Sequence, residues 1–220
     1  MRIDFVSDVA CPWCAIGLSS LERALERIGD DIEVELHMQP FELNPKMPPE
    51  GVDAADYLIA KYGMDRAQLA ANQARIAERG ADEGFAFGAR TQIWNTFDAH
   101  RALFWAAVEG PPGSQRALKR ALLEAYHGQG RNPGAHDVLL ELAEPLGLPV
   151  ERAREVLEQG EFTDEVREAE RFWQELGIHS VPAIVVNRKH LISGGQPNAV
   201  FEQALRQIAA EGEDGTTGPR

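Results

Sequence analysis

The two cysteines of the chain lie three residues apart, in the segment Cys11-Pro12-Trp13-Cys14. They are the only cysteines among 220 residues, and they stand between an apolar-rich N-terminal stretch and a helical pattern. Two thiols at positions i and i+3 can close a small disulfide and open it again. The first turn of a helix favours an anion, because its backbone N–H groups are unpaired and the helix dipole points there. The segment therefore predicts a redox-active dithiol.

The two sulfurs are expected to have different roles. Cys11 precedes Pro12 at the start of the helix, where placement can lower a cysteine pKa from about 8.5 to roughly 3.5–7, so we expect it to be the nucleophile. Cys14 lies one turn deeper and would be the less accessible, resolving thiol. Pro12 and Trp13 should tune the reduction potential, and Trp13 either offers substrate an apolar platform or caps the sheet edge. The alternatives are two buried structural cysteines or a zinc site, and a zinc site lacks its second cysteine pair.

Composition restricts the class of protein. Hydrophobic residues make up 44 % and charged residues 26 %, as expected of a soluble globular chain with a real core. The net charge of −13 argues against binding to nucleic acid or to an anionic membrane. Asp4 and Asp8 interrupt the apolar region that a signal peptide would need. We therefore expect a cytoplasmic protein, in which a lone cysteine pair is more often catalytic or metal-binding than structural.

Hydrophobic periodicity predicts an α/β protein. Residues 3–6 read as a buried strand, residues 16–28 as a helix and residues 32–38 as an alternating strand, which gives a βαβ unit. Strands at 183–186 and 190–192 and a helix from Pro197 give a ββα unit. Between these units, helices are predicted at 53–62, 65–79, 96–109, 114–127, 135–146, 151–159 and 164–176.

The two outer units make one sheet if they fold together. We then expect residues 1–43 and 177–211 to form one domain and residues 44–176 to form an inserted, all-helical domain. The Gly-, Thr- and acid-rich tail, residues 212–220, is expected to be disordered.

This order resembles the thioredoxin-like fold with a large all-helical insertion, the hallmark of the DsbA-like group. Three features carry the resemblance: the CPWC segment after the first strand, Val181-Pro182 before the strand pair, and residues 194–197 before the last helix. The segment NTFDAHR, residues 95–101, is similar to one that the FrnE-like branch places near its active site. The resemblance covers roughly residues 1–210 and extends to 2-hydroxychromene-2-carboxylate isomerases and kappa-class glutathione transferases.

Further residues are candidates for the site, and for Pro182 and Val181 the resemblance implies the role. Pro182 should follow a cis peptide bond, with the backbone of Val181 presented to an extended substrate, whereas an ordinary proline at a strand start would be trans. Asn95 could hydrogen-bond substrate or cap a helix. His100 could face the dithiol and stabilise a thiolate, or be a packing residue. Asp8 is expected to be a solvated loop residue, although a carboxylate near the dithiol would raise a thiol pKa.

These features favour a DsbA-like, FrnE-type thiol–disulfide oxidoreductase that acts on a thiol- or disulfide-containing protein or small molecule. No metal and no tightly bound cofactor are expected, with glutathione as a candidate reductant or co-substrate. One alternative is a glutathione-dependent isomerase or transferase, although those relatives usually have a serine near the position of Cys11 and no second cysteine. Another is a chaperone whose helical insertion holds its partners. The direction of electron flow and the oligomeric state stay open.

Overall fold

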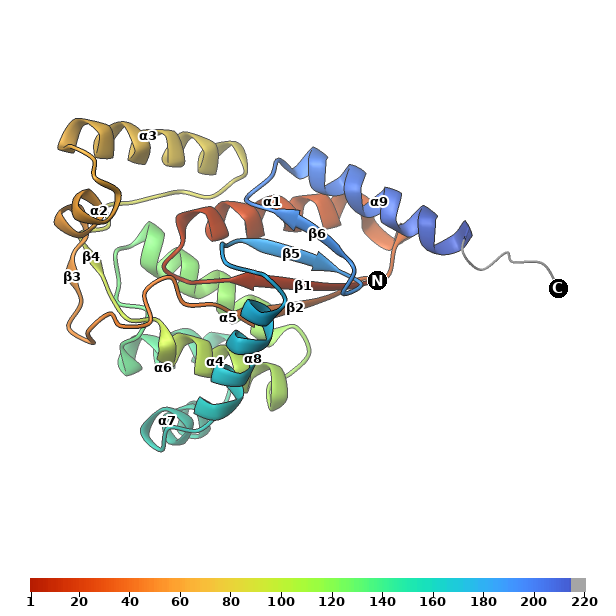
Figure 1. The fold of residues 1–220 in the computed structure, drawn as a ribbon. Coiled ribbons are helices and arrows are strands. Elements are labelled where there is room, and N and C mark those ends of the chain that lie inside the picture. The colour runs from red at the N-terminus through yellow and green to blue at the C-terminus, as the bar shows by residue number, and fades with distance from the viewer. Residues whose placement is uncertain (215–220) are drawn as a thin grey trace.

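A four-stranded sheet lies at the centre of the computed structural model, which describes residues 1–214 (Figure 1). Its strand order is β2-β1-β5-β6. β1 (Arg2–Ser7) pairs in parallel with β2 (Glu35–Pro40) and antiparallel with β5 (Ala183–Val186), and β6 (His190–Ser193) pairs antiparallel with β5. The two ends of the chain therefore share one sheet, and the predicted α/β, thioredoxin-like architecture is confirmed.

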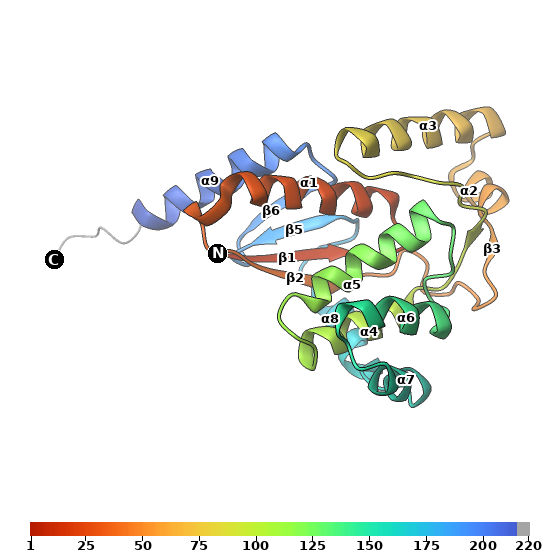
Figure 2. The same cartoon turned by 180° about the vertical axis from the view of Figure 1, so that it is seen from behind.

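Helices lie on both sides of this sheet. α1 (Pro12–Ile28) and α9 (Asn198–Asp214) pack side by side along one face, and α8 (Thr163–Glu175) contacts β2 from the other side (Figures 1 and 2). α9 reaches into the segment expected to be a disordered tail, whose last six residues, 215–220, lie outside the described residues. No helix within residues 1–214 combines the length and the apolar character that crossing a bilayer requires.

The edge strand β2 is covered by the inserted segment. α5 (Ser114–Leu123) runs along it, and the Gln115 side chain exchanges two hydrogen bonds of 3.0 Å with the backbone N–H and C=O of Met38. An uncovered edge presents unpaired backbone groups to other strands. The Gln115 amide supplies hydrogen-bond partners to the backbone of Met38 and shields the edge of β2 there.

The insertion contains the expected helices, with ends shifted by a few residues. They are α2 (Ala54–Tyr62), α3 (Arg66–Asp82), α4 (Phe97–Val108), α5, α6 (His136–Ala143), α7 (Val150–Glu158) and α8. The segment is not all-helical, however: β3 (Val52–Asp53) pairs antiparallel with β4 (Gln92–Ile93) at the base of the α2–α3 arm. Two residues are too few to show an alternating pattern, so this pair was not predictable from hydrophobic periodicity.

Short irregular turns extend several of the main elements. Turns of 3₁₀ helix follow α1 at Gly29–Asp31 and α6 at Glu144–Leu146. The helix predicted at 114–127 ends at Leu123, and a π-helical turn, Glu124–Gly128, continues it.

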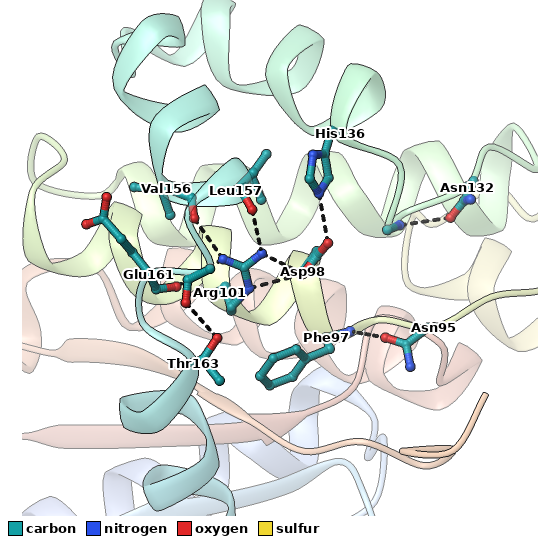
Figure 3. A network of polar contacts seen from close by, with 12 residues as sticks. Asn95, Phe97, Asp98, Arg101, Asn132, His136, Val156, Leu157, Glu161 and Thr163 are labelled. Carbon is teal, nitrogen blue, oxygen red and sulfur yellow. Dashed lines mark hydrogen bonds and ion pairs between the residues drawn. The ribbon is translucent and has the colours of Figure 1, made fainter. Parts of the chain in front are cut away.

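Buried Arg101 links α4 to α7 and to the turn between α7 and α8 (Figure 3). From α4 its guanidinium donates to the carbonyl oxygens of Val156 (2.8 Å), Leu157 (3.1 Å) and Glu161 (3.0 Å). The last carbonyls of a helix have no partner within it, and a cation is favoured there. Asp98 lies 2.7 Å from Nη2 of Arg101 and balances its charge. This cluster fixes α4 against the end of α7 and the start of α8.

One hydrophobic core joins the insertion to the sheet. A single cluster of buried side chains takes in Phe5 of β1, Leu18 of α1, Trp105 of α4, Leu122 of α5 and Phe201 of α9. The α2–α3 arm contributes little to burial: within its two helices only Ala54, Leu69 and Gly80 are buried. Most of the insertion is thus packed as firmly as the sheet, while this arm is lightly attached.

Replacing Leu122, which is fully buried, tests the shared core. Leu122→Ala should lower the free energy of unfolding by about 2–5 kcal/mol, because it removes buried methyl groups and leaves a cavity. Circular dichroism and tryptophan fluorescence should report one coincident denaturant transition in the wild type and in the variant. Leu191→Ala, at a side chain 54 % exposed, is the control and should stay within about 0.5 kcal/mol. Two separate transitions would show that the insertion and the sheet unfold independently.

Candidate active site

The dithiol lies after β1, at the start of α1. Cys11 is the residue that caps α1, Pro12 is its first residue, and the backbone N–H of Cys14 donates to the carbonyl of Cys11 over 3.1 Å. Both thiols are free. Cys14 is fully buried, as expected, but Cys11 is only 4 % exposed, which is less than the sequence led us to expect. The Val181 carbonyl is one of the groups that cover it, with its oxygen 3.6 Å from Cys11 Sγ.

The surroundings shift the pKa values of the two thiols in opposite directions. A hydrogen bond from the Cys14 thiol lowers the pKa of Cys11, and the backbone N–H groups of Cys14 and Trp13 add to this against the effects of burial and of Asp8. Burial raises the pKa of Cys14 well above its usual value, and the neighbouring Cys11 raises it further. Cys11 is therefore the thiol that ionises first, and a thiolate is the reactive form.

The Val181–Pro182 peptide bond is cis, as the family resemblance implied. The proline packs on α1 at Gly17, where an added Cβ would stand 3.1 Å from Pro182 Cγ. At Gly195 an added Cβ would stand 2.9 Å from the carbonyl oxygen of Trp13. Glycine at both positions lets the two loops approach the first turns of α1, where Pro12 and Trp13 are half-buried. Cys11, Pro12, Val181 and Pro182 thus come together in one place.

Asp8 is fully buried, so the expectation of a solvated loop residue was wrong. Its carboxylate accepts hydrogen bonds from the backbone N–H groups of Ala10 (3.0 Å) and Leu43 (2.7 Å) and from the Thr96 hydroxyl (2.8 Å). Burial by itself would raise the pKa of Asp8, but interactions with His100 and with those backbone N–H groups outweigh it and hold the pKa below its usual range. Partners 35 and 88 residues away explain why the sequence pattern did not reveal this role.

His100 is connected to the dithiol through Asp8. It is buried on α4, and its Nε2 lies 3.5 Å from Asp8 Oδ1. His100 is thus a packed side chain of α4 whose imidazole lies beside the Asp8 carboxylate, and a role for it at the dithiol stays a prediction.

Asn95 uses its side chain within the fold. Its Oδ1 accepts a 2.8 Å hydrogen bond from the backbone N–H of Phe97, at the start of α4 (Figure 3), and its Nδ2 donates to the Met47 carbonyl over 3.0 Å. This arrangement favours the helix-capping alternative over direct contact with substrate.

Lys119 is a residue of the site that the sequence analysis missed. It lies on α5, is fully buried and interacts electrostatically with both thiols and with Asp8. Burial lowers its pKa, while the negative charges of these neighbours oppose the shift. Its position held a signal, because it precedes Leu122, Leu123 and Tyr126 by three, four and seven residues and so shares their buried face.

The chain is similar to known proteins over almost its whole length. The model of the DSBA-like thioredoxin domain matches residues 2–206. A probable DsbA oxidoreductase from Streptomyces coelicolor has the same fold, with a TM-score of 0.88 and 36 % identity over 96 % of this chain and 91 % of that chain.

Two more distant structures share the fold. The cytosolic disulfide reductase DsbM from Pseudomonas aeruginosa, solved with glutathione, has a TM-score of 0.63 at 20 % identity, covering 94 % of this chain and 100 % of that chain. A 2-hydroxychromene-2-carboxylate isomerase has a TM-score of 0.72 at 15 % identity, covering 97 % and 98 %. The match to the family model, over the sheet and the insertion alike, shows that the chain belongs to the DsbA-like thioredoxin family and is, in general terms, a thiol–disulfide oxidoreductase.

Proposed function

We propose that the protein exchanges disulfides through a reversible Cys11–Cys14 bond, with Cys11 as the nucleophile and Cys14 as the resolving thiol. The observation that carries this proposal is the placement of the two thiols in one turn of α1, with Cys11 at the N-terminus of the helix and Cys14 fully buried behind it. This placement lowers the pKa of Cys11 and raises that of Cys14. A thiol that ionises readily can attack, and one that keeps its proton waits until the mixed disulfide has formed. The substrate is a thiol- or disulfide-containing protein or small molecule.

Reduction of a substrate disulfide proceeds in two exchanges. The Cys11 thiolate attacks one substrate sulfur, a bond forms between them, and the other substrate sulfur leaves as a thiolate that takes a proton from solvent. Cys14 then loses its proton and attacks Cys11 Sγ, which releases the second substrate thiolate and closes the Cys11–Cys14 disulfide. Two electrons pass from the enzyme to the substrate. The reverse sequence oxidises a substrate dithiol, and the reduction potential of the pair decides the direction.

The neighbours of the dithiol support this chemistry. The positive charge of Lys119 favours ionisation of Cys14 and partly offsets its burial at the second step. His100 acts through Asp8 as a positioning residue, Asn95 shapes the start of α4, and Pro12 and Trp13 tune the reduction potential. The Val181 backbone, already in contact with the Cys11 thiol, offers an extended substrate a place to add as a short strand.

Glutathione use is the second candidate function. A glutathione-dependent isomerase or transferase would share this fold, since both the isomerase and DsbM, solved with glutathione, do so. The intact cysteine pair favours exchange, with glutathione as reductant or co-substrate and no tightly bound cofactor. A lone dithiol of this kind suits a reducing compartment such as the cytoplasm.

Replacing the resolving thiol separates these functions. Cys14→Ser should retain attack by Cys11 but block its release, so mixed disulfides on Cys11 should accumulate in cell extract and be identified by mass spectrometry. Turnover with a model disulfide should fall at least tenfold, because a serine hydroxyl cannot resolve the adduct. Cys11→Ser is the control and should trap nothing. Full activity of Cys14→Ser with glutathione would instead favour an isomerase or transferase, and holdase activity without either thiol would favour a chaperone.

The acidity of Cys11 should depend on Cys14. In the reduced wild type, alkylation of Cys11 should reach its plateau at a pH below that of an ordinary cysteine, because a lowered pKa means that thiolate is present at lower pH. Cys14→Ala removes the hydrogen-bond donor, so the Cys11 pKa should rise. Cys14→Ser keeps a donor and should raise it less. Equal titration of Cys11 in all three proteins would show that the thiol–thiol hydrogen bond does not set its acidity.

A further inference from the structure

A groove beside the dithiol has no role in the chemistry described so far. One wall is the face of α3 that carries Gln73, Ile76 and Ala77, and the other is the loop of residues 87–91. It holds about 930 Å³ of empty space, part of which is open solvent. Pro12 lies in its lining, so the groove reaches the residue that follows the nucleophile.

Arg90 is the one charged side chain of this lining. The other lining residue that could carry a positive charge, His127, is neutral, because burial lowers its pKa to about 3. Arg90 is also tied to the dithiol loop: its Nη1 donates to the carbonyl of Ala10 over 3.1 Å, and its guanidinium lies 5.4 Å from the centre of the Tyr126 ring.

These contacts leave the charge of Arg90 free for a ligand. Neither the Ala10 carbonyl nor the Tyr126 side chain is an anion, since burial raises the pKa of Tyr126 to about 12. A guanidinium has five N–H donors in a fork that matches a carboxylate, and the contacts with Ala10 and Tyr126 use only part of it. A half-buried arginine at the rim of an apolar groove, in a chain of net charge −13, is therefore suited to recognise a carboxylate.

We propose that this groove binds the carboxylate end of a low-molecular-weight disulfide, of the class of glutathione disulfide, while a sulfur of that ligand reaches Cys11. Arg90 pairs with the carboxylate, and Ile76, Ala77 and Phe87 pack against the apolar stem. The proposal rests on the proposed function, because it needs Cys11 as the attacking thiol. The Cys11 thiolate displaces one glutathione thiolate, Cys14 displaces the second, and two electrons pass from the enzyme dithiol to the ligand.

A small ligand suits this site better than an acidic protein. The net charge of −13 would repel an acidic protein over its whole contact area. A ligand with its carboxylate at Arg90 keeps that charge close to one cation, and physiological salt screens the other charges beyond about 8 Å.

Three small disulfides that differ in charge test the proposal on the reduced, full-length protein. Glutathione disulfide is anionic, hydroxyethyl disulfide is neutral and cystamine is cationic, and stopped-flow tryptophan fluorescence follows oxidation of the dithiol. For Arg90→Gln, the ratio of the second-order rate constants for glutathione disulfide and hydroxyethyl disulfide should fall about tenfold, which corresponds to about 1.4 kcal/mol, because the charge-assisted hydrogen bond to the carboxylate is lost. Arg90→Lys, which keeps the charge but not the fork, should recover part of the ratio.

Arg75→Gln is the matched control. Arg75 lies on α3, the helix that forms one wall of the groove, but it is exposed and outside the groove lining, and it bonds to Asn72. Its loss changes the net charge equally and should leave the ratio as in the wild type. An unchanged ratio in Arg90→Gln would overturn the proposal that the groove binds the carboxylate, while leaving the proposed function standing. Equal slowing with all three disulfides would also overturn it, since Arg90 would then act on the Ala10–Cys11 loop. A larger loss with an acidic peptide disulfide than with glutathione disulfide would assign the groove to a protein segment. If none of the disulfides oxidised the wild type, the proposed function itself would fail.

Discussion

The buried carboxylate of Asp8 is the interaction on which the active site depends. It binds the backbone just before Cys11, the backbone at Leu43 beyond the end of β2, and the Thr96 hydroxyl at the start of α4. A carboxylate taken out of water is costly unless hydrogen bonds replace its hydration, so these three segments must meet in one arrangement. Asp8 thus joins the sheet, the dithiol loop and the insertion next to the two cysteines.

The same carboxylate sets the electrostatic balance of the dithiol. Its charge opposes ionisation of Cys11, whereas the Cys14 thiol and the backbone N–H groups at the start of α1 favour it. Lys119 faces this cluster from α5 and favours ionisation of Cys14. A positive and a negative group, both fully buried, therefore act on the two thiols, and neither is exposed to screening by salt. The reactivity of the pair is a property of the whole junction, because one charge comes from the loop after β1 and the other from the insertion.

The sequence revealed the features that repeat or lie close together along the chain. The helices of the insertion were predictable because their buried faces recur with helical spacing, and the dithiol was predictable because both cysteines belong to one turn. Local pattern could not show that Asp8 meets Leu43 and Thr96, or that Arg90 reaches back to Ala10 across 80 residues. The strand predicted at 32–38 begins and ends too early along the chain, because β2 runs from Glu35 to Pro40. Its position is fixed by the register of its pairing with β1, which a local pattern does not show. Lys119 lies between these cases, since its spacing placed it on a buried face while its residue type suggested a solvated one.

The dithiol lies in the firmly packed part of the molecule, whereas the proposed ligand groove borders the lightly packed α2–α3 arm. The dithiol, the cis-proline and Asp8 are held by the shared core and by buried hydrogen bonds, and a reacting group misplaced by about 1 Å can lose about a hundredfold in rate. The groove beside them takes one wall from α3, in which only Leu69 and Gly80 of 17 residues are buried. Segments with few buried contacts move at low free-energy cost, so this wall can adjust to ligands of different length without disturbing the core. Differences in substrate between proteins of this architecture are therefore expected to arise in the α2–α3 arm and the loop after it, while the first turn of α1 stays fixed by Asp8.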